Sequence, residues 1–459
     1  MDLDAYLTSL QGKRVAVIGI GVSNRPLIQL LLSRGIFVTA RDRKSKDALG
    51  PLAQELEKQG CQLKLGEDYL KDLQEDVIFR TPGMRPDLPE LTAAVDQGSQ
   101  LTSEMEVFSK VCPCPMIAVT GSDGKTTTTT IIAGLLRKAG KTVHLGGNIG
   151  NPLLAEAGSM APEDIAVLEL SSFQLMTMDV SPHIAVVTNL APNHLDVHKD
   201  LQEYISAKEN IFTHQSAQDI AIFNADNAIT SEESSRAVGK VRLFSRKREL
   251  EEGVFLRGNA IISRSGGQER QVMTVEDIQL LGDHNVENYL AAIAAVEGLV
   301  SDGAIRDFAQ DFGGVEHRIE LFRTRNGVRW YNDSIASSPS RTIAGLRAFG
   351  SQKVILIAGG KDKGISYEEL GPVINSHVKL LLLCGATAGV IRRVTEQAAN
   401  YSGLEIVDVE DLREAVSVAD GHSQSGDVVI LSPASTSFDR FANFMERGRT
   451  FKEIVNALA

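Results

Sequence analysis

The stretch from Met116 to Leu136 constrains the fold of this chain more than any other. Met116 to Val119 is a short apolar run that stops at a turn signal, which is typical of a buried strand. From Lys125 onward, apolar pairs recur at helical spacing and predict a helix. The loop between them holds two glycines, and such a loop before a helix N-terminus can turn backbone N–H groups toward an anion. We therefore expect a phosphate-binding loop in an α/β domain.

The loop sequence, Thr-Gly-Ser-Asp-Gly-Lys-Thr, departs from the standard P-loop pattern. The first glycine of that pattern would stand at Val119, so only a shorter T-G-x-x-G-K-T remains. Lys125 offers a point charge to phosphate oxygens, and the Thr126 hydroxyl is suited to Mg²⁺. An ordinary strand-to-helix turn is the alternative, and the lysine and threonine together favour the phosphate site.

Length and composition indicate an ordinary globular protein of about three domains, at roughly 150 residues per domain. The 459 residues are 43% hydrophobic and 23% charged. No apolar run approaches the ~18–20 residues that span a bilayer, and the N-terminus lacks the features of a signal peptide. The four cysteines form neither a disulfide framework nor a metal pattern, and the net charge of −12 disfavours a nucleic-acid surface. We expect a cytoplasmic protein that binds small ligands, without nucleic-acid partners or membrane insertion.

The N-terminal third predicts a Rossmann-like layout. A strand at 14–18 runs into a Gly19-x-Gly21-x-x-Asn24 turn and a helix, and a second strand ends at Asp42. Because Asn24 stands where the dinucleotide pattern has its third glycine, NAD is the weaker interpretation and another nucleotide-type ligand the favoured one. A further strand ends near Thr81-Pro-Gly83, where α/β sheets place ligands.

In the middle third, polar side chains follow predicted strands. Glu169 ends a strand beside the phosphate loop, where a carboxylate can bind Mg²⁺, although a chance acid is the alternative. The Asn193–His198 run either converges on a site or is a solvated loop. Lys208 lies on the next predicted helix and has the pattern of a solvated lysine. Asn285 and Asn288 open an Ala-rich helix that extends to about residue 300, where they either cap the helix or contact a base.

The remaining chain predicts an antiparallel excursion at 241–280 and then a second doubly wound unit. That unit has four strands, and each ends in Gly, Ser or Asp. We expect three domains, at 1–112, 113–314 and 315–459.

Together these motifs resemble the Mur ligases, the ATP-dependent amide-forming enzymes of peptidoglycan precursor synthesis. The resemblance runs from about residue 12 to the C-terminus. Its motifs are T-G-S-D-G-K-T-T-T at 120–128, G-G-N-I-G at 146–150, E-L-S-S-F-Q-L at 169–175, N-H-L-D-x-H at 193–198, H-N-x-x-N at 284–288, E-H-R at 316–318, N-D-S at 332–334 and S-P-A-x-x-S-F-D-x-F at 432–441. The Ser-Ser-Phe-Gln and C-terminal segments are similar to those of the D-glutamate-adding branch.

The resemblance implies that a carboxylate of UDP-N-acetylmuramoyl-L-alanine takes the γ-phosphate of ATP and that D-glutamate then displaces the phosphate through a tetrahedral intermediate. Both steps develop negative charge on oxygen, so metal and fixed cations matter more than a protein nucleophile. The implied catalytic residues are Lys125, Glu169, His194 and Lys208. Two Mg²⁺ ions would bind Thr126, Glu169, His194 and Lys208, the last carrying CO₂ as a carbamate.

The resemblance also implies a monomeric enzyme in which 1–112 binds the UDP substrate, 113–314 binds ATP, and 315–459 contributes to ATP and amino-acid binding. It further implies the binding residues. Those for ATP are Gly121, Ser122, Asp123, Gly124, Lys125, Thr126, Thr127, Asn285, Asn288, Arg318 and Asp333. Those for the UDP substrate and D-glutamate are Gly21, Val22, Ser23, Asp42, Thr81, Gly83, Asn148, Ser171, Ser337, Lys363, Ser437, Phe438 and Phe444.

One departure concerns Ile335, where many relatives have a lysine after Asn-Asp-Ser. The aliphatic side chain cannot contact a phosphate or carboxylate, and Lys361 is a candidate replacement. Two alternatives stay open: a sister ligase (or a folylpolyglutamate synthetase) that adds another amino acid, and a nucleotide-binding homologue without turnover.

Overall fold

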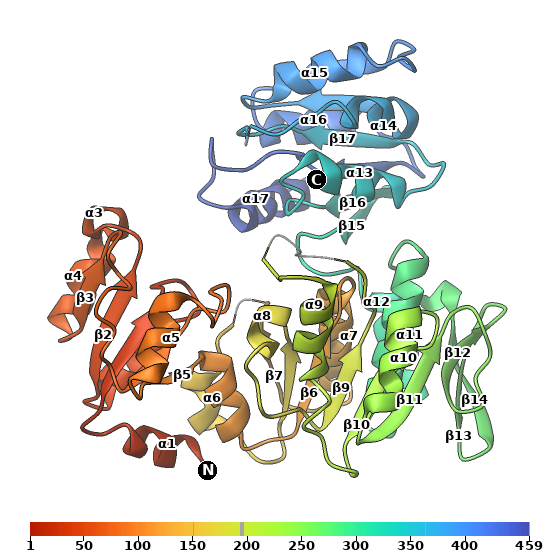
Figure 1. Cartoon of the computed structure of the whole chain (residues 1–459). Coiled ribbons are helices and arrows are strands. Elements are labelled where there is room, and N and C mark those ends of the chain that lie inside the picture. The colour runs from red at the N-terminus through yellow and green to blue at the C-terminus, as the bar shows by residue number, and fades with distance from the viewer. Residues whose placement is uncertain (150, 193–196, 363, 459) are drawn as a thin grey trace. The chain divides into compact units, whose positions relative to one another are not determined.

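The computed structural model describes residues 1–149, 151–192, 197–362 and 364–458. The chain forms two compact units, Met1–Asp277 with Val286–Phe308, and Ile278–Asn285 with Ala309–Ala459. Within the described residues there are two sheets in the first unit and one in the second (Figure 1). The α/β class with mostly parallel sheets and a three-domain architecture is confirmed, and the predicted domain boundaries stay a prediction.

The first sheet has five parallel strands. Its elements are α1 (Leu3–Ser9), β1 (Arg14–Ile18), α2 (Arg25–Ser33), β2 (Phe37–Asp42), α3 (Lys46–Leu49), α4 (Pro51–Lys58), β3 (Gln62–Leu65), β4 (Val77–Phe79), α5 (Pro89–Asp96), β5 (Gln100–Thr102) and α6 (Glu104–Val111). The strand order is β3-β2-β1-β4-β5. The central strand β1 is an apolar run because both faces of a parallel sheet are covered.

The second sheet has nine strands in the order β14-β13-β12-β11-β10-β9-β6-β8-β7. Its elements are β6 (Met116–Thr120), α7 (Lys125–Lys138), β7 (Val143–Gly147), η1 (Leu154–Ser159), β8 (Ile165–Glu169), α8 (Ser172–Leu175), β9 (Ile184–Val187), α9 (Leu201–Glu209), β10 (Ile220–Asn224), α10 (Ala228–Glu233), η2 (Ser234–Arg236), β11 (Lys240–Ser245), β12 (Gly253–Arg257), β13 (Ala260–Ser265), β14 (Gln268–Thr274), η3 (Val275–Asp277), α11 (Asp283–Ala295) and α12 (Asp302–Asp311).

The expected antiparallel excursion was only partly right. β11 pairs parallel with both β10 and β12, and only β13 pairs antiparallel with its two neighbours, β12 and β14. The Ala-rich helix α11 also ends at Ala295, earlier than the apolar pattern predicts. Val296 and Val300 are nevertheless buried after the helix ends, whereas Leu299 between them is exposed.

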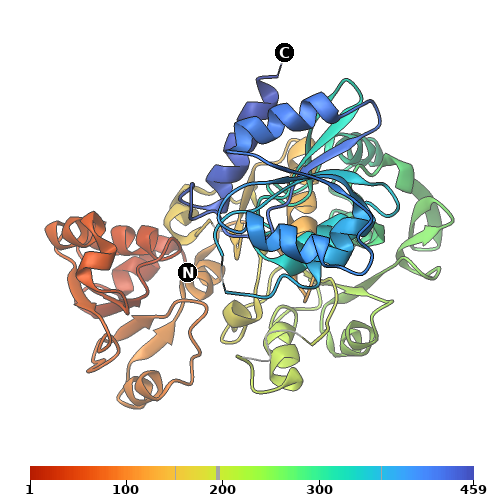
Figure 2. The same cartoon turned by 90° about the horizontal axis from the view of Figure 1, so that it is seen from above.

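The third sheet, in the second unit, has six strands in the order β15-β16-β20-β17-β18-β19. Its elements are β15 (Glu320–Arg325), β16 (Val328–Asn332), α13 (Pro339–Arg347), β17 (Val354–Ala358), α14 (Leu370–His377), β18 (Val378–Leu383), α15 (Ala388–Glu396), β19 (Glu405–Asp408), α16 (Leu412–His422), β20 (Val428–Leu431) and α17 (Phe444–Asn456). One apolar cluster joins the sheet to α13, α14 and α15, and another joins it to α16 and α17. Helices therefore cover both faces (Figure 2).

A single apolar cluster links the first two sheets. It includes Leu27 and Leu31 on α2, Met105 on α6, and Leu154 on η1, together with residues of β6 and β9. Burial of this shared surface fixes the first sheet against the second. Within the described ranges, no helix is both long and apolar enough to cross a membrane.

Candidate active site

The predicted phosphate loop connects β6 to α7, and both of its glycines have positive φ. A Cβ at Gly121 (φ 152°) would lie 2.0 Å from Thr188 Oγ1, and one at Gly124 (φ 79°) would lie 2.4 Å from Asn288 Oδ1. Only glycine fits these two positions without rearrangement. Gly124 precedes α7, whose first N–H groups have no partner within the helix and carry its positive dipole end.

The loop's remaining groups are held in place by hydrogen bonds. Ser122 N donates to Asn189 O, and Asp123 N donates to Asn189 Oδ1 at 2.9 Å. The Ser122 hydroxyl contacts Tyr204 Oη at 2.9 Å. Lys125 Nζ donates to Gly121 O and Ser122 O, both at 2.9 Å, so its charge lies over the loop. A cation over a glycine loop at a helix N-terminus suits a polyphosphate.

Glu169, at the carboxyl end of β8, faces the start of α7. The Thr126 hydroxyl donates to Glu169 Oε2 at 2.7 Å, and Asn148 Nδ2 donates to Glu169 Oε1 at 2.6 Å. These contacts follow from the parallel register, since β8 lies between β6 and β7 and all three end at one sheet edge. The glutamate is 2% exposed. The sequence prediction placed these side chains near one another, and the structure does so.

Lys208, on the last turn of α9, reaches the underside of the same loop. Its Nζ donates to Gly121 O at 2.9 Å and to Thr120 Oγ1 at 3.1 Å, and lies 4.9 Å from the centroid of the Tyr204 ring. The side chain is buried, not solvated as its sequence pattern suggested. Burial, with help from the charge of Lys125, lowers the pKa of the Lys208 amine well below its usual value.

The other predicted ATP contacts are divided between the units. Asn288 is buried, and its Oδ1 accepts from the Thr128 hydroxyl at 3.2 Å, so it contacts α7. Asn285 donates instead to Leu281 O at 2.8 Å. Thr127 is half-buried on the first turn of α7. The Ser171 side chain forms a capping box with Gln174 at the start of α8, which is a structural role.

The predicted UDP contacts gather at the carboxyl ends of β1, β2 and β4. Asp42 Oδ2 accepts from Ile20 N at 2.6 Å, which fixes the first Gly turn. Gly21, Val22 and Ser23 on that turn are exposed, with Val22 71% exposed. A Cβ at Gly19 would lie 3.1 Å from Thr81 Cβ, so that glycine brings the two turns together. Gly83 is exposed in the segment after β4.

In the second unit, Asp333 is buried at the end of β16. It accepts from Ser432 Oγ at 2.8 Å and from Ile319 N at 3.2 Å. Burial raises the pKa of this carboxyl to about 7. Arg318, predicted beside it, is exposed. Its charge counteracts part of that rise in the pKa of Asp333.

We expect Asp333→Asn to flatten the pH dependence of unfolding. The native carboxyl keeps its proton up to about pH 7, whereas the unfolded one loses it above about pH 3.8, so this group's stabilisation is lost as pH rises between these values. An asparagine does not titrate, so the variant gains relative stability on the alkaline side of this window. Thermal unfolding across the window, with exposed Asp362→Asn as the control, measures this. Parallel profiles for wild type and Asp333→Asn would contradict it.

The predicted amino-acid contacts lie on loops of the second unit. Ser437 is buried, whereas Phe438 is 63% exposed. Phe444 begins α17 and packs edge-on against His317 at 5.9 Å. Ser337 follows β16, and its N–H donates to Ile335 O at 2.7 Å. Predicted residues His194 and Lys363, and the motif position Gly150, lie outside the described residues.

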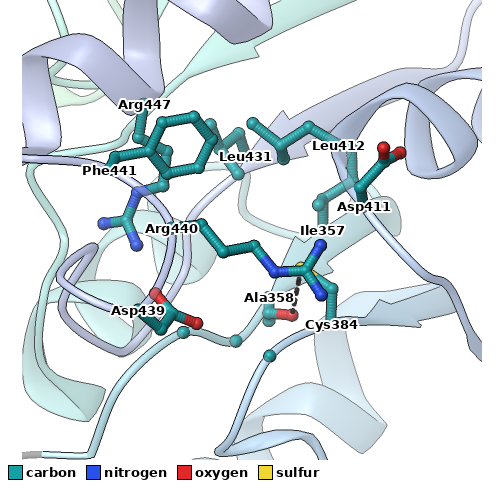
Figure 3. Close-up of a pocket in the computed structure, with 13 residues that line it drawn as sticks. Ile357, Ala358, Cys384, Asp411, Leu412, Leu431, Asp439, Arg440, Phe441 and Arg447 are labelled. Carbon is teal, nitrogen blue, oxygen red and sulfur yellow. Dashed lines mark hydrogen bonds between the residues drawn. The ribbon is translucent and has the colours of Figure 1, made fainter.

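A pocket lies in the third sheet at the carboxyl ends of β17, β18 and β20 (Figure 3). Cys384, Leu412, Asp439, Arg440 and Arg447 are among the side chains that line it. Its volume of about 40 Å³ is enough for a few waters and too small for a nucleotide or an amino acid. We therefore place no substrate there.

Several residues that build the site were missed from sequence. Thr120, Asn189 and Tyr204 hold the loop or Lys208, and the buried Arg447 bridges the backbones of Ser334 and Ser435. The i, i+4 spacing of Tyr204 and Lys208 on one helix was the only available signal, since it places both on one face. The other contacts join segments far apart in sequence, and nothing local marks them.

Comparisons with known proteins agree with this geometry. Residues 119–296 match the Mur ligase middle domain, and residues 317–435 match the Mur ligase glutamate ligase domain. The chain is 52% identical over 461 residues to the UDP-N-acetylmuramoylalanine–D-glutamate ligase of Acetivibrio thermocellus, covering 99% of both chains. It is 50% identical to the enzyme of the same name from Ruminiclostridium cellulolyticum, again over 99% of both.

Solved structures share the fold at low sequence identity. The UDP-N-acetylmuramate-alanine ligase of Thermotoga maritima matches with a TM-score of 0.57 and 18% identity, over 97% of this chain and 99% of that one. A UDP-N-acetylmuramoyl-L-alanyl-D-glutamate–2,6-diaminopimelate ligase matches with a TM-score of 0.57 and 19% identity, over 97% and 92%. At this identity the similarity concerns the fold alone.

Proposed function

The chain belongs to the Mur ligase family, and from this premise we propose that it joins D-glutamate to UDP-N-acetylmuramoyl-L-alanine at the expense of ATP, giving ADP and phosphate in peptidoglycan precursor synthesis. One observation carries the proposal: the chain is half identical, over 99% of its length, to ligases named for this reaction. The cluster of Lys125, Glu169 and Lys208 around one phosphate loop supports it.

The chemistry needs two steps that this cluster suits. In the first, an oxygen of the substrate carboxylate attacks the γ-phosphorus, the bond to the ADP oxygen breaks, and an acyl phosphate forms. In the second, the amine of D-glutamate attacks the acyl carbon, loses a proton, and expels phosphate from the tetrahedral intermediate. Lys125 and the N-terminus of α7 stabilise negative charge on the phosphate oxygens in both steps.

The residues present fit Mg²⁺, which prefers oxygen ligands. The Thr126 hydroxyl and the Glu169 carboxylate are adjacent, at 2.7 Å, beside the phosphate loop. Among the described residues no three His, Cys, Asp or Glu side chains form a metal cluster, so further ligands would be waters, phosphate oxygens, His194 and modified Lys208. We propose two ions, which when bound neutralise charge on the transferred phosphoryl group.

Lys208 fits the proposed carbamate. Only a neutral amine reacts with CO₂, and burial favours the neutral form of this one. The product would be an anionic, oxygen-bearing group near Glu169 and the loop. It would convert a buried lysine into a metal ligand of the kind that Mg²⁺ accepts.

The substrate contacts follow the family resemblance. We propose that the UDP end lies on Gly21, Val22, Ser23 and Asp42. Thr81, Gly83 and Asn148 would lie nearer the sugar and phosphates, and Ser171 would also contact the substrate. For ATP we keep Gly121 to Thr127 with Asn285, Asn288, Arg318 and Asp333, and for D-glutamate Ser337, Lys363, Ser437, Phe438 and Phe444. Lys361, exposed after β17, stays the candidate to replace the lysine absent at Ile335. We also propose that the chain has three domains, at 1–112, 113–314 and 315–459, and that it is a monomer in the cytoplasm.

A panel of amino acids tests the proposed substrate. With UDP-N-acetylmuramoyl-L-alanine and ATP, we expect amide formation with D-glutamate at least about a hundredfold faster than with L-glutamate, glycine or L-lysine. Glycine and L-lysine lack the second carboxylate, and the opposite stereochemistry of L-glutamate misplaces its carboxylates when the amine is at the acyl carbon, so polar groups of the site stay unpaired. Mass analysis of the product measures this. Preference for another amino acid with its matched acceptor would indicate a sister ligase, and amide formation with none would indicate a non-catalytic homologue.

A further inference from the structure

Two arginines tie the segment after β4 to the helices of the second sheet. Arg80 is 1% exposed, and its Nη2 donates to Phe173 O at 3.1 Å and to Thr177 Oγ1 at 2.7 Å. Arg85 stands five residues later. The segment between them includes Thr81 and Gly83, which we assigned to the UDP substrate.

Arg85 uses all five of its N–H groups. Nη1 donates to Val197 O at 2.7 Å and to Glu203 Oε2 at 2.9 Å, and Nη2 donates to Glu203 Oε1 and Asp87 Oδ2, both at 2.8 Å. Nε donates to Asp87 Oδ1 at 2.8 Å. The guanidinium therefore pairs with two carboxylates, each through two bonds, and with one backbone carbonyl. A lysine has three donors without this planar geometry and cannot reproduce it.

Glu203 connects this cluster to the proposed metal site. It lies on the first turn of α9, the helix that carries Lys208. Its Oε2 also accepts from Lys199 N at 2.8 Å and lies 3.5 Å from His198 Nδ1, so it holds the backbone just after residues 193–196. Arg85 lowers the pKa of Glu203 to about 2, so the carboxylate is ionised near neutral pH.

From this geometry we propose that Arg85 is a positioning residue that couples the UDP-substrate segment to the metal site. By holding Val197 and the start of α9, it sets the position of Lys208 for metal binding. This inference rests on the proposed function. The phosphate loop makes none of these contacts, so Arg85 affects the requirement for magnesium and for the UDP substrate and not that for ATP.

Kinetics of Arg85→Ala tests the coupling. We expect the magnesium concentration for half-maximal rate and the KM for UDP-N-acetylmuramoyl-L-alanine to rise about tenfold, since partners of metal ligands typically matter by about 10–100-fold. The KM for ATP should change less than about twofold, because the Arg85 side chain does not contact the phosphate loop. Arg85→Lys should not rescue the variant. Glu203→Gln should reproduce part of the effect, and the double variant should lose less than the sum of the two single losses, because both single variants remove the Arg85–Glu203 pair.

The chain offers a matched control in Arg257. It also pairs with two carboxylates, Glu249 and Glu269, but on the antiparallel hairpin of β12 and β13. Arg257→Ala should keep wild-type kinetics. Loss of a two-carboxylate ion pair would then not by itself explain the Arg85 phenotype.

Amide hydrogen exchange supplies a readout that needs no turnover. In the substrate-free protein, Arg85→Ala and Glu203→Gln should speed exchange in peptides covering 197–206 by about tenfold, as expected when a local contact is lost. Arg257→Ala should not. Unchanged exchange and unchanged kinetics in Arg85→Ala would overturn the inference, and so would faster exchange with unchanged magnesium and substrate dependence. A wild-type enzyme without D-glutamate-dependent activity would instead overturn the proposed function.

Discussion

Lys208→Ala is expected to lower kcat by about a hundredfold to a thousandfold, the range for losing one group that stabilises charge in a transition state. The reason is burial, which lowers the pKa of the Lys208 amine and so favours the neutral form that can take up CO₂. Alanine has no group to modify, so under the carbamate proposal the variant lacks one oxygen ligand for the metal. Fold stability should hold, because removing a buried amine also removes its desolvation cost.

A steady-state assay with added short carboxylic acids measures this. Acetate or formate, which supplies a small carboxylate, should restore part of the rate, whereas chloride at equal ionic strength should not. Lys141→Ala, on an exposed turn of the same unit, is the control and should match wild type. A Lys208→Ala enzyme with the full rate would end the carbamate proposal.

Glu169→Gln is expected to lower kcat by about a hundredfold to a thousandfold, because the variant also loses a group that stabilises charge in the transition state. Glutamine keeps the size of the side chain but has one acceptor oxygen and no charge. Thr126 and Asn148 both donate to the present carboxylate, so the new amide NH₂ would face one donor. The magnesium concentration for half-maximal rate should rise accordingly.

A melting-temperature measurement separates a loss of metal binding in Glu169→Gln from unfolding of the variant. Since Glu169 is a buried charge, its neutral replacement should leave the melting temperature within a few degrees of wild type. The matched control is Glu104→Gln: that glutamate is also buried in the first unit but accepts from Leu154 N, away from the loop. Wild-type magnesium dependence in Glu169→Gln, or equal losses in both variants, would contradict the proposed metal role.

Central strands were predictable from sequence, whereas some edge strands were not. β6, β8 and β17 are continuous apolar runs because both of their faces are covered. β3 and β19 are half-exposed edge strands with mixed composition, and they are strands because a neighbour supplies hydrogen bonds. The third sheet was therefore predicted with too few strands.

The residues of the site also divide into some that the sequence predicts and some that it does not. Glu169 and the phosphate loop could be brought together from sequence, because strand ends of a parallel sheet share one edge. Lys208 could not, since its burial depends on a fold that encloses α9 against β6, and only the family resemblance singled it out. The Arg85–Glu203 contact joins residues 118 positions apart. Nothing local in either segment predicts such a pair.

The measurement that tests the central claim most directly is phosphate release from ATP by the purified chain, with UDP-N-acetylmuramoyl-L-alanine and D-glutamate each present or omitted. The account predicts release that requires both, because phosphate leaves only when the amine attacks the acyl phosphate. Release that continues without D-glutamate, or no release with both substrates present, would contradict it.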